Sequence, residues 1–159
     1  MGWKFCLVHL GSDCCTNDRR TVSVSNIILY NFDAGLVAQM TDEDVERLMQ
    51  FDGIVKNRLK IKSTITNARL FLAIQKEFGS FYDYTLSFFP DRKPIINAFR
   101  SLSEIPVSSP ESDAMSKDMK KRGFKFFGTA ICYAHLQASG FIDDHLTDCL
   151  CRKVVRQDG

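Results

Sequence analysis

The stretch KKRGFKFFGTAICYAHLQASG, from Lys120 to Gly140, decides the fold. It begins with consecutive cations, passes two glycines, Gly123 and Gly128, and continues into an apolar segment. Glycine ends helices because it tolerates a left-handed backbone. A helix that starts directly after a tight hairpin presents unpaired backbone N–H groups, which form an anion site. The stretch therefore predicts a helix-hairpin-helix element that holds a DNA backbone without reading its sequence.

The residues of this predicted DNA site supply positive charge, turn geometry and a helix start. They are Lys120, Lys121, Arg122, Gly123, Lys125, Gly128 and Thr129. The alternative is an ordinary α-hairpin with glycine caps, which is common in any helical bundle. The spacing alone leaves both interpretations open.

Helix signals are dense from Phe32 onward, and the chain shows no convincing strand alternation after Tyr30. Thr41 is placed to cap a helix with Asp42, Glu43 and Asp44 in its first turn. Ser109 or Ser112 is placed to cap a helix that carries Ala114, Met115 and Met119 inward and ends at Gly123. Further helices are expected over Lys56–Phe78, Ser80–Phe89, Thr129–Ser139 and Asp143–Leu150, with a surface loop over Pro90–Pro106. The expected fold class is all-α.

The composition is that of a soluble globular protein. The 159 residues fit one domain, with 45% hydrophobic residues, 25% charged residues and a net charge of +2. No stretch reaches the roughly 20 apolar residues of a membrane span, and residues 1–10 lack a secretory signal pattern. We therefore expect a cytoplasmic protein with reduced thiols, whose six cysteines serve packing or metal binding.

Positive charge gathers in two segments, Lys56–Lys62 and Lys117–Lys125, while the segment Asp42–Glu46 is acidic. A charge run is most often a solvated helix face. This interpretation stands beside the DNA-binding one.

His145 and Cys149 lie four residues apart, so on a helix both side chains would share one face and hold one tetrahedral metal ion. An unliganded pair is the alternative. Two further ligands are needed, with candidates at Cys6, His9, Cys14, Cys15 and Cys151. His135 is expected to be a satisfied core histidine.

Three segments together resemble a known family. They are NFDAGLVAQMTDEDVERLM, GIVKNRLKIKSTITNARLFLAIQKEFGSFYDY and LSEIPVSSPESDAMSKDMKKRGFKFFGTAICYAHLQASGFIDDHLTDC. From about Asn31 to Arg152, roughly three quarters of the chain, the sequence closely resembles the bacterial DNA-3-methyladenine glycosylase I family. The resemblance runs almost without gaps.

The resemblance implies an all-helical helix-hairpin-helix DNA glycosylase of base excision repair. Such an enzyme would hydrolyse the N-glycosidic bond of 3-methyladenine in double-stranded alkylated DNA after flipping the base. It would be monomeric, away from membranes, and without a catalytic cofactor. A structural zinc ion is implied, with His145 and Cys149 matching two of its ligands and Cys6 and His9 as possible additional ones. The family's hairpin matches Arg122–Thr129.

Residues 1–30 do not match the family, which carries its pocket glutamate, pocket aromatics and wedge in the corresponding region. The catalytic residues of this chain are therefore unassigned. We expect a divergent segment at 1–30, arising from a frameshift or a wrong start, a helical glycosylase domain at 31–152 and a tail at 153–159. A non-catalytic DNA-binding remnant or a truncated inactive fragment is the alternative to an active enzyme.

Overall fold

The computed structural model describes residues 33–51 and 56–149. The expectations for residues 1–30 and 153–159 lie outside the described residues. The same holds for five candidate metal ligands, Cys6, His9, Cys14, Cys15 and Cys151.

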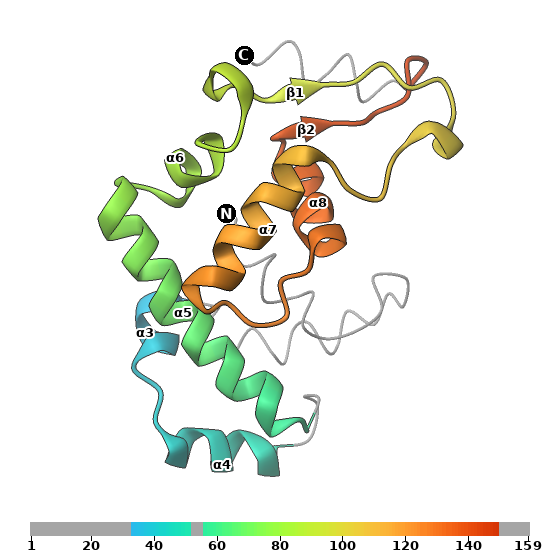
Figure 1. Cartoon of the computed structure of the whole chain (residues 1–159). Helices are drawn as coiled ribbons and strands as arrows, with labels where there is room; N and C mark the ends of the chain where they lie inside the picture. Colours follow the sequence, from blue (N-terminus) through green and yellow to red (C-terminus); the bar gives the residue numbers. More distant parts are fainter. Residues whose placement is uncertain (1–32, 52–55, 150–159) are drawn as a thin grey trace.

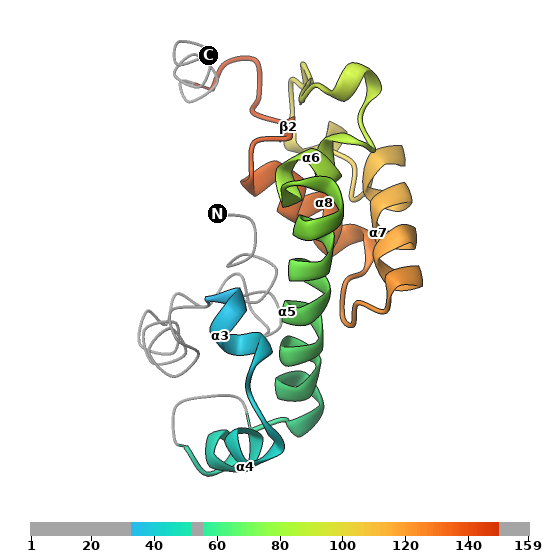
Figure 2. The same cartoon turned by 90° about the vertical axis from the view of Figure 1, so that its left-hand side faces the viewer.

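The long helix α5 (Arg58–Phe78) runs through the middle of the molecule (Figure 1). Asn57 begins it by accepting the Lys60 N–H, and Gly79, at φ 82°, ends it. Figure 2 shows α3 (Ala34–Ala38) and α4 (Asp42–Gln50) on one side of α5 and α7 (Pro110–Arg122) on the other. The predicted helix over Lys56–Phe78 is confirmed, with its start two residues later.

The α4 helix begins as its sequence predicts. The Thr41 hydroxyl accepts the Asp44 N–H at 3.4 Å, and the Asp44 carboxylate accepts the Thr41 N–H at 2.9 Å. This reciprocal capping satisfies two N–H groups that the first turn would leave unpaired. Arg69 of α5 donates to the Ala38 carbonyl at 2.8 Å and ties the segment before α4 to the long helix.

The helices α7 and α8 (Thr129–Ala138) pack against each other, and a six-residue loop at 123–128 joins them (Figure 1). Ser109 and Ser112 form the capping box of α7, with Pro110 at its first position. Both predicted helices are confirmed. Met115 and Met119 are fully buried as expected, but Ala114 is exposed, so its inward placement was wrong.

The segment after α6 (Phe81–Leu86) contains the short helices η2 (Pro90–Arg92) and η3 (Leu102–Glu104). Between them, β1 (Ile95–Ile96) pairs in parallel with β2 (Ile142–Asp143). The sequence analysis missed these strands because two residues are too few to show alternation. The rest of this segment is largely exposed, as predicted.

The helix predicted over Asp143–Leu150 was wrong, since residues 143–149 contain no helix. The Asp143 carbonyl accepts the Asn97 N–H at 2.9 Å, which holds this backbone extended. The next residue, Asp144, accepts hydrogen bonds from Tyr133, Gln137 and Asn97 at 2.6, 2.7 and 2.7 Å. Tertiary hydrogen bonds therefore outweigh the local helix preference.

The core between α5, α6 and α8 is rich in aromatic rings. The His135 ring is 1% exposed and lies between Phe81 and Phe127, at 6.3 Å from each ring centroid. Its expected place in the core is confirmed. Among the described helices, none combines the length and apolarity needed to cross a membrane.

Candidate nucleic-acid interface

The loop between α7 and α8 turns sharply at Gly123. This glycine lies at φ 103°, in the left-handed region, and its N–H donates to the Lys120 carbonyl. A side chain here would be strained whatever the space around it. The predicted glycine stop is therefore a requirement of the turn. The loop that follows runs back along α7, because Thr129 at the start of α8 contacts Ser112 and Asp113 in the first turn of α7.

Two buried polar side chains hold the backbone of the loop. Asn67 of α5 accepts the Lys125 N–H at 2.9 Å and donates to the Lys125 carbonyl at 3.0 Å. Ser116 of α7 donates to the Phe127 carbonyl at 3.0 Å. Asn67 and Ser116 are 1% and 2% exposed, so water does not compete for these bonds. The loop is thus anchored to both α5 and α7.

Within the described part of the chain, no side chain caps the N-terminus of α8. Gly128 occupies the capping position at φ −81°, which any residue could adopt, and a Cβ atom built there would meet nothing within 4 Å. Neither strain nor crowding by residues that the structure describes explains the glycine. It leaves the backbone N–H groups of the first turn of α8 approachable by an anion. The Thr129 hydroxyl, by contrast, is already engaged by Asp113.

Three exposed lysines lie in the last turn of α7 and in the loop that leads to α8. Lys120, Lys121 and Lys125 are exposed, and none of the three forms an ion pair with a residue that the structure describes. These lysines, Gly123, Gly128 and Thr129 lie on the hairpin and on the two helix ends that it joins.

Arg122 has different surroundings from the lysines. Its guanidinium makes two bonds to Glu77 of α5, at 2.6 and 3.1 Å, and one to Asp118 at 2.7 Å. It also lies 5.3 Å from the Phe78 ring centroid and 5.4 Å from that of Tyr84. These contacts tie the end of α7 to the end of α5.

The contacts around Arg122 shift the pKa of three groups, Arg122, Glu77 and Tyr84. Its hydrogen bonds to Glu77 and then Asp118 raise the pKa of the guanidinium, and the bond to Arg122 lowers the pKa of Glu77. Burial, followed by a hydrogen bond to Asp118, raises the pKa of the Tyr84 hydroxyl. The cluster is therefore charged at Arg122 and Glu77 and neutral at Tyr84 near pH 7.

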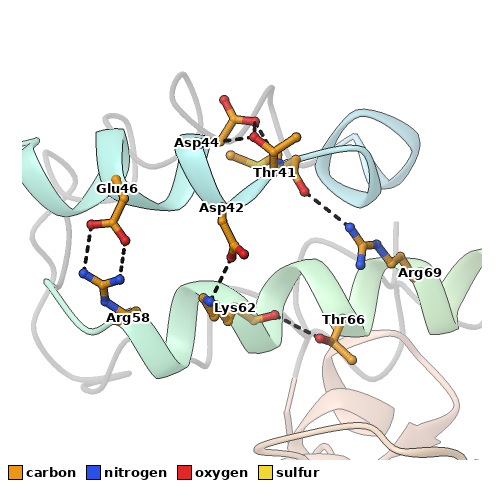
Figure 3. A network of polar contacts seen from close by, with 9 residues as sticks. Thr41, Asp42, Asp44, Glu46, Arg58, Lys62, Thr66 and Arg69 are labelled. Carbon is orange, nitrogen blue, oxygen red and sulfur yellow. Dashed lines mark hydrogen bonds and ion pairs between the residues drawn. The ribbon is translucent and has the colours of Figure 1, made fainter.

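The other basic segment, at the start of α5, faces the acidic helix α4. Figure 3 shows Arg58 paired with Glu46 through two bonds, and Lys62 paired with Asp42 at 2.8 Å. The Lys62 pair lowers the pKa of Asp42, first through the hydrogen bond and then through charge. Much of the charge that this segment offers is neutralised within the chain.

The two predicted metal ligands also lie together. The Cys149 sulfur is 3.7 Å from the His145 Nδ1, although no helix carries them. Within residues 33–51 and 56–149, no group of three or more potential metal-binding side chains occurs. The pair therefore falls short, within the described residues, of the four donors that a tetrahedral zinc ion needs.

Comparison with known proteins decides the family. The family model described as methyladenine glycosylase matches residues 22–153. The chain belongs to this family. The matched region begins at residue 22, within the segment 1–30 that does not resemble the family in the sequence analysis.

Related proteins agree with this membership. The chain is 47% identical over 122 residues to DNA-3-methyladenine glycosylase 1 of Escherichia coli (strain K12), a match that covers 77% of this chain and 65% of that protein. A crystal structure of 3-methyladenine DNA glycosylase I superposes with a TM-score of 0.83 at 42% identity, covering 94% of this chain and 82% of that one. A variant of 3-methyladenine DNA glycosylase I in complex with 3-methyladenine gives a TM-score of 0.79 at 32% identity, covering 92% and 81%. The all-α fold is confirmed.

Sequence reasoning did not find Asn67 and Ser116, the two residues that anchor the hairpin. A signal for Asn67 was present, since it lies in the middle of α5 between Ile65 and Ala68, on the buried face. A polar side chain on such a face needs a partner. The partner is 58 residues away in the sequence, so no local pattern identifies it.

Proposed function

We propose that this chain is a DNA-3-methyladenine glycosylase, which removes 3-methyladenine from alkylated double-stranded DNA in base excision repair. The observation that carries the proposal is the uncapped N-terminus of α8 behind Gly128, in a family of methyladenine glycosylases. Backbone N–H groups there would bind one phosphate of the damaged strand. Lys120, Lys121 and Lys125 would add the long-range attraction.

The hairpin would hold the backbone while the damaged nucleotide is swung out of the duplex. We assign Arg122 to positioning the hairpin, because its guanidinium already binds Glu77 and Asp118. Binding through backbone amides and lysines is independent of sequence, as a search for rare damage requires.

The chemical step makes modest demands on the protein. A methylated adenine carries positive charge, so it is a good leaving group, and cleavage of the bond between its nitrogen and the sugar leaves a neutral base. An aromatic and acidic pocket would favour this cationic base over normal adenine. No residue of this chain is assigned to that pocket.

We further propose that His145 and Cys149 contribute two ligands to a structural zinc ion. Their 3.7 Å separation and their donor types, an imidazole nitrogen and a thiolate, suit zinc. Cys6 and His9 are the proposed additional ligands. Zinc here would join distant parts of the chain and take no part in catalysis.

The test is release of 3-methyladenine from methylated double-stranded DNA by the purified 159-residue chain. A full-length family member serves as positive control and unmethylated DNA as negative control. Release of 3-methyladenine, and of no normal base, is the expected result.

A chain that binds DNA without releasing a base is the second candidate, because the described hairpin accounts for backbone binding on its own. Salt-sensitive binding with no release, under conditions where the positive control is active, would favour this candidate and reject the proposed enzyme. Loss of both binding and release would reject the two candidates together.

A further inference from the structure

Phe126 has an unusual conformation at the tip of the hairpin. Its backbone lies at φ 57°, in the left-handed region that bulky residues avoid. Its side chain is 43% exposed, whereas the adjacent hairpin rings of Phe124 and Phe127 are 4% and 2% exposed. The conformation of Phe126 therefore costs free energy for two reasons: its backbone is strained, and its apolar ring is exposed to water.

The fold imposes this conformation. Asn67 holds both backbone polar groups of Lys125, directly before Phe126, and Ser116 holds the carbonyl of Phe127, directly after it. Both holding side chains are buried. The outward ring of Phe126 is consequently a fixed feature of the hairpin, anchored on either side by hydrogen bonds.

The surroundings of the ring indicate what would cover it. Lys125 directly precedes Phe126, Lys120 and Lys121 lie in the last turn of α7 before the hairpin, and α8 begins directly after Gly128. A ligand that fits must present negative charge next to an apolar surface. A nucleic-acid strand does this, because each deoxyribose offers C–H groups between two phosphates. A second copy of this surface would bring like charges together, which disfavours self-pairing.

We propose that Phe126 packs against a deoxyribose of the strand whose phosphate binds at the N-terminus of α8. This inference rests on the proposed function and adds an apolar, sequence-independent contact to the phosphate contacts. The ring supplies contact area without counterion release, and the lysines supply the charge.

The experiment measures binding of the full chain to a short unmodified DNA duplex by fluorescence anisotropy over a series of salt concentrations. Phe126→Gly is expected to weaken binding roughly fivefold to tenfold and to leave the salt dependence unchanged. Phe126→Tyr keeps the ring and should bind within about twofold of the unaltered chain, because its apolar face is retained. Lys125→Ala should instead reduce the slope of log K against log salt by about 1.

Two controls separate binding from folding. The melting temperature of Phe126→Gly should be no lower than that of the unaltered chain, because glycine adopts this φ without strain. Leu102→Ala, at an exposed apolar position in η3, outside the hairpin, should change neither affinity nor salt dependence.

The outcomes distinguish this inference from the function on which it rests. If Phe126→Gly binds as tightly as the unaltered chain while Lys125→Ala shows its reduced slope, the deoxyribose contact is overturned and the proposed function stands. The same holds if Phe126→Gly abolishes self-association and leaves DNA affinity intact. Absence of any DNA binding by the unaltered chain overturns both.

Discussion

The basic segment that starts α5 and the basic end of α7 carry the same kinds of side chain in opposite surroundings. At α5, Arg58 and Lys62 face the acidic side chains of α4 and form ion pairs with them. At α7, Lys120 and Lys121 are exposed where the helix enters the hairpin, and Arg122 is paired with Glu77. A run of positively charged residues therefore does not predict DNA binding by itself, because acidic side chains that pack against it in the fold can neutralise its charge.

The largest expected effect comes from removing the anchor that distinguishes the α7 end. Asn67→Ala removes a buried side chain and both of its hydrogen bonds to the backbone of Lys125, so the free energy of unfolding should fall by about 2–4 kcal/mol. Chemical denaturation measures this change in stability. The hydroxyl of the adjacent Thr66 donates to the Lys62 carbonyl within α5. Thr66→Ala should therefore lower the free energy of unfolding by less than about 0.5 kcal/mol. Equal destabilisation of the two variants would contradict the anchoring role of Asn67.

The comparison predicts unequal DNA binding by the two basic segments. Replacing Lys120, Lys121 and Lys125 with alanine together should reduce the salt-dependence slope of DNA binding by roughly 3, about 1 for each lysine that binds a phosphate. Replacing Arg58 and Lys62 should change it by less than about 1, since their charges are already paired within the chain. Anisotropy titrations over a salt series measure both. A larger change from the α5 pair would reverse the assignment of the DNA-binding face.

A smaller effect is expected at the capping position of α8. Gly128→Asp supplies the missing cap and should raise the free energy of unfolding by a few tenths of a kcal/mol. It should also weaken DNA binding by on the order of tenfold, because the new carboxylate occupies the anion site and repels phosphate. Melting curves and anisotropy titrations on one preparation test the expected gain in stability and the expected loss of DNA affinity.

Gly128→Ala adds a Cβ without charge and serves as the matched control. Unchanged DNA affinity in Gly128→Asp would exclude this helix end as the phosphate site.

The smallest effect concerns pH and the Arg122 cluster. The bond to Arg122 lowers the pKa of Glu77 from its ordinary value of 4.5, so this pair stabilises the fold above that value. The stabilisation is lost as the pH falls through the lowered pKa and Glu77 becomes protonated. Glu77→Gln should therefore be less stable than the unaltered chain at neutral pH, with the difference shrinking in acid. Melting curves from pH 7 downward measure it, and a constant difference across that range would refute the role of the ion pair.

Local sequence signals predicted most of the helices. The Thr41 cap, the Ser109 cap with Pro110, and the glycines at 79 and 123 act within one turn of the chain, so their neighbours in sequence suffice to locate them. The prediction after Asp143 was wrong because Asp144 accepts bonds from Asn97 and Tyr133, which no local pattern reveals.

In the candidate site, too, local sequence signals predicted some features and long-range contacts decided others. The sequence placed Lys120, Gly123 and Gly128 on one hairpin, because only six residues separate the end of α7 from the start of α8. It gave no indication that Arg122 is engaged, since its partner Glu77 is 45 residues away.

The amino-acid sequence by itself determined the family, the helix boundaries set by caps and glycines, and the hairpin with its basic end, since these depend on short-range geometry and composition. Only the tertiary structure decided which charges remain available to a phosphate and which aromatic ring faces outward at Phe126. Those properties depend on acids and amides that α4 and α5 bring from distant parts of the chain, where long-range hydrogen bonds and ion pairs select one arrangement among many that the sequence allows.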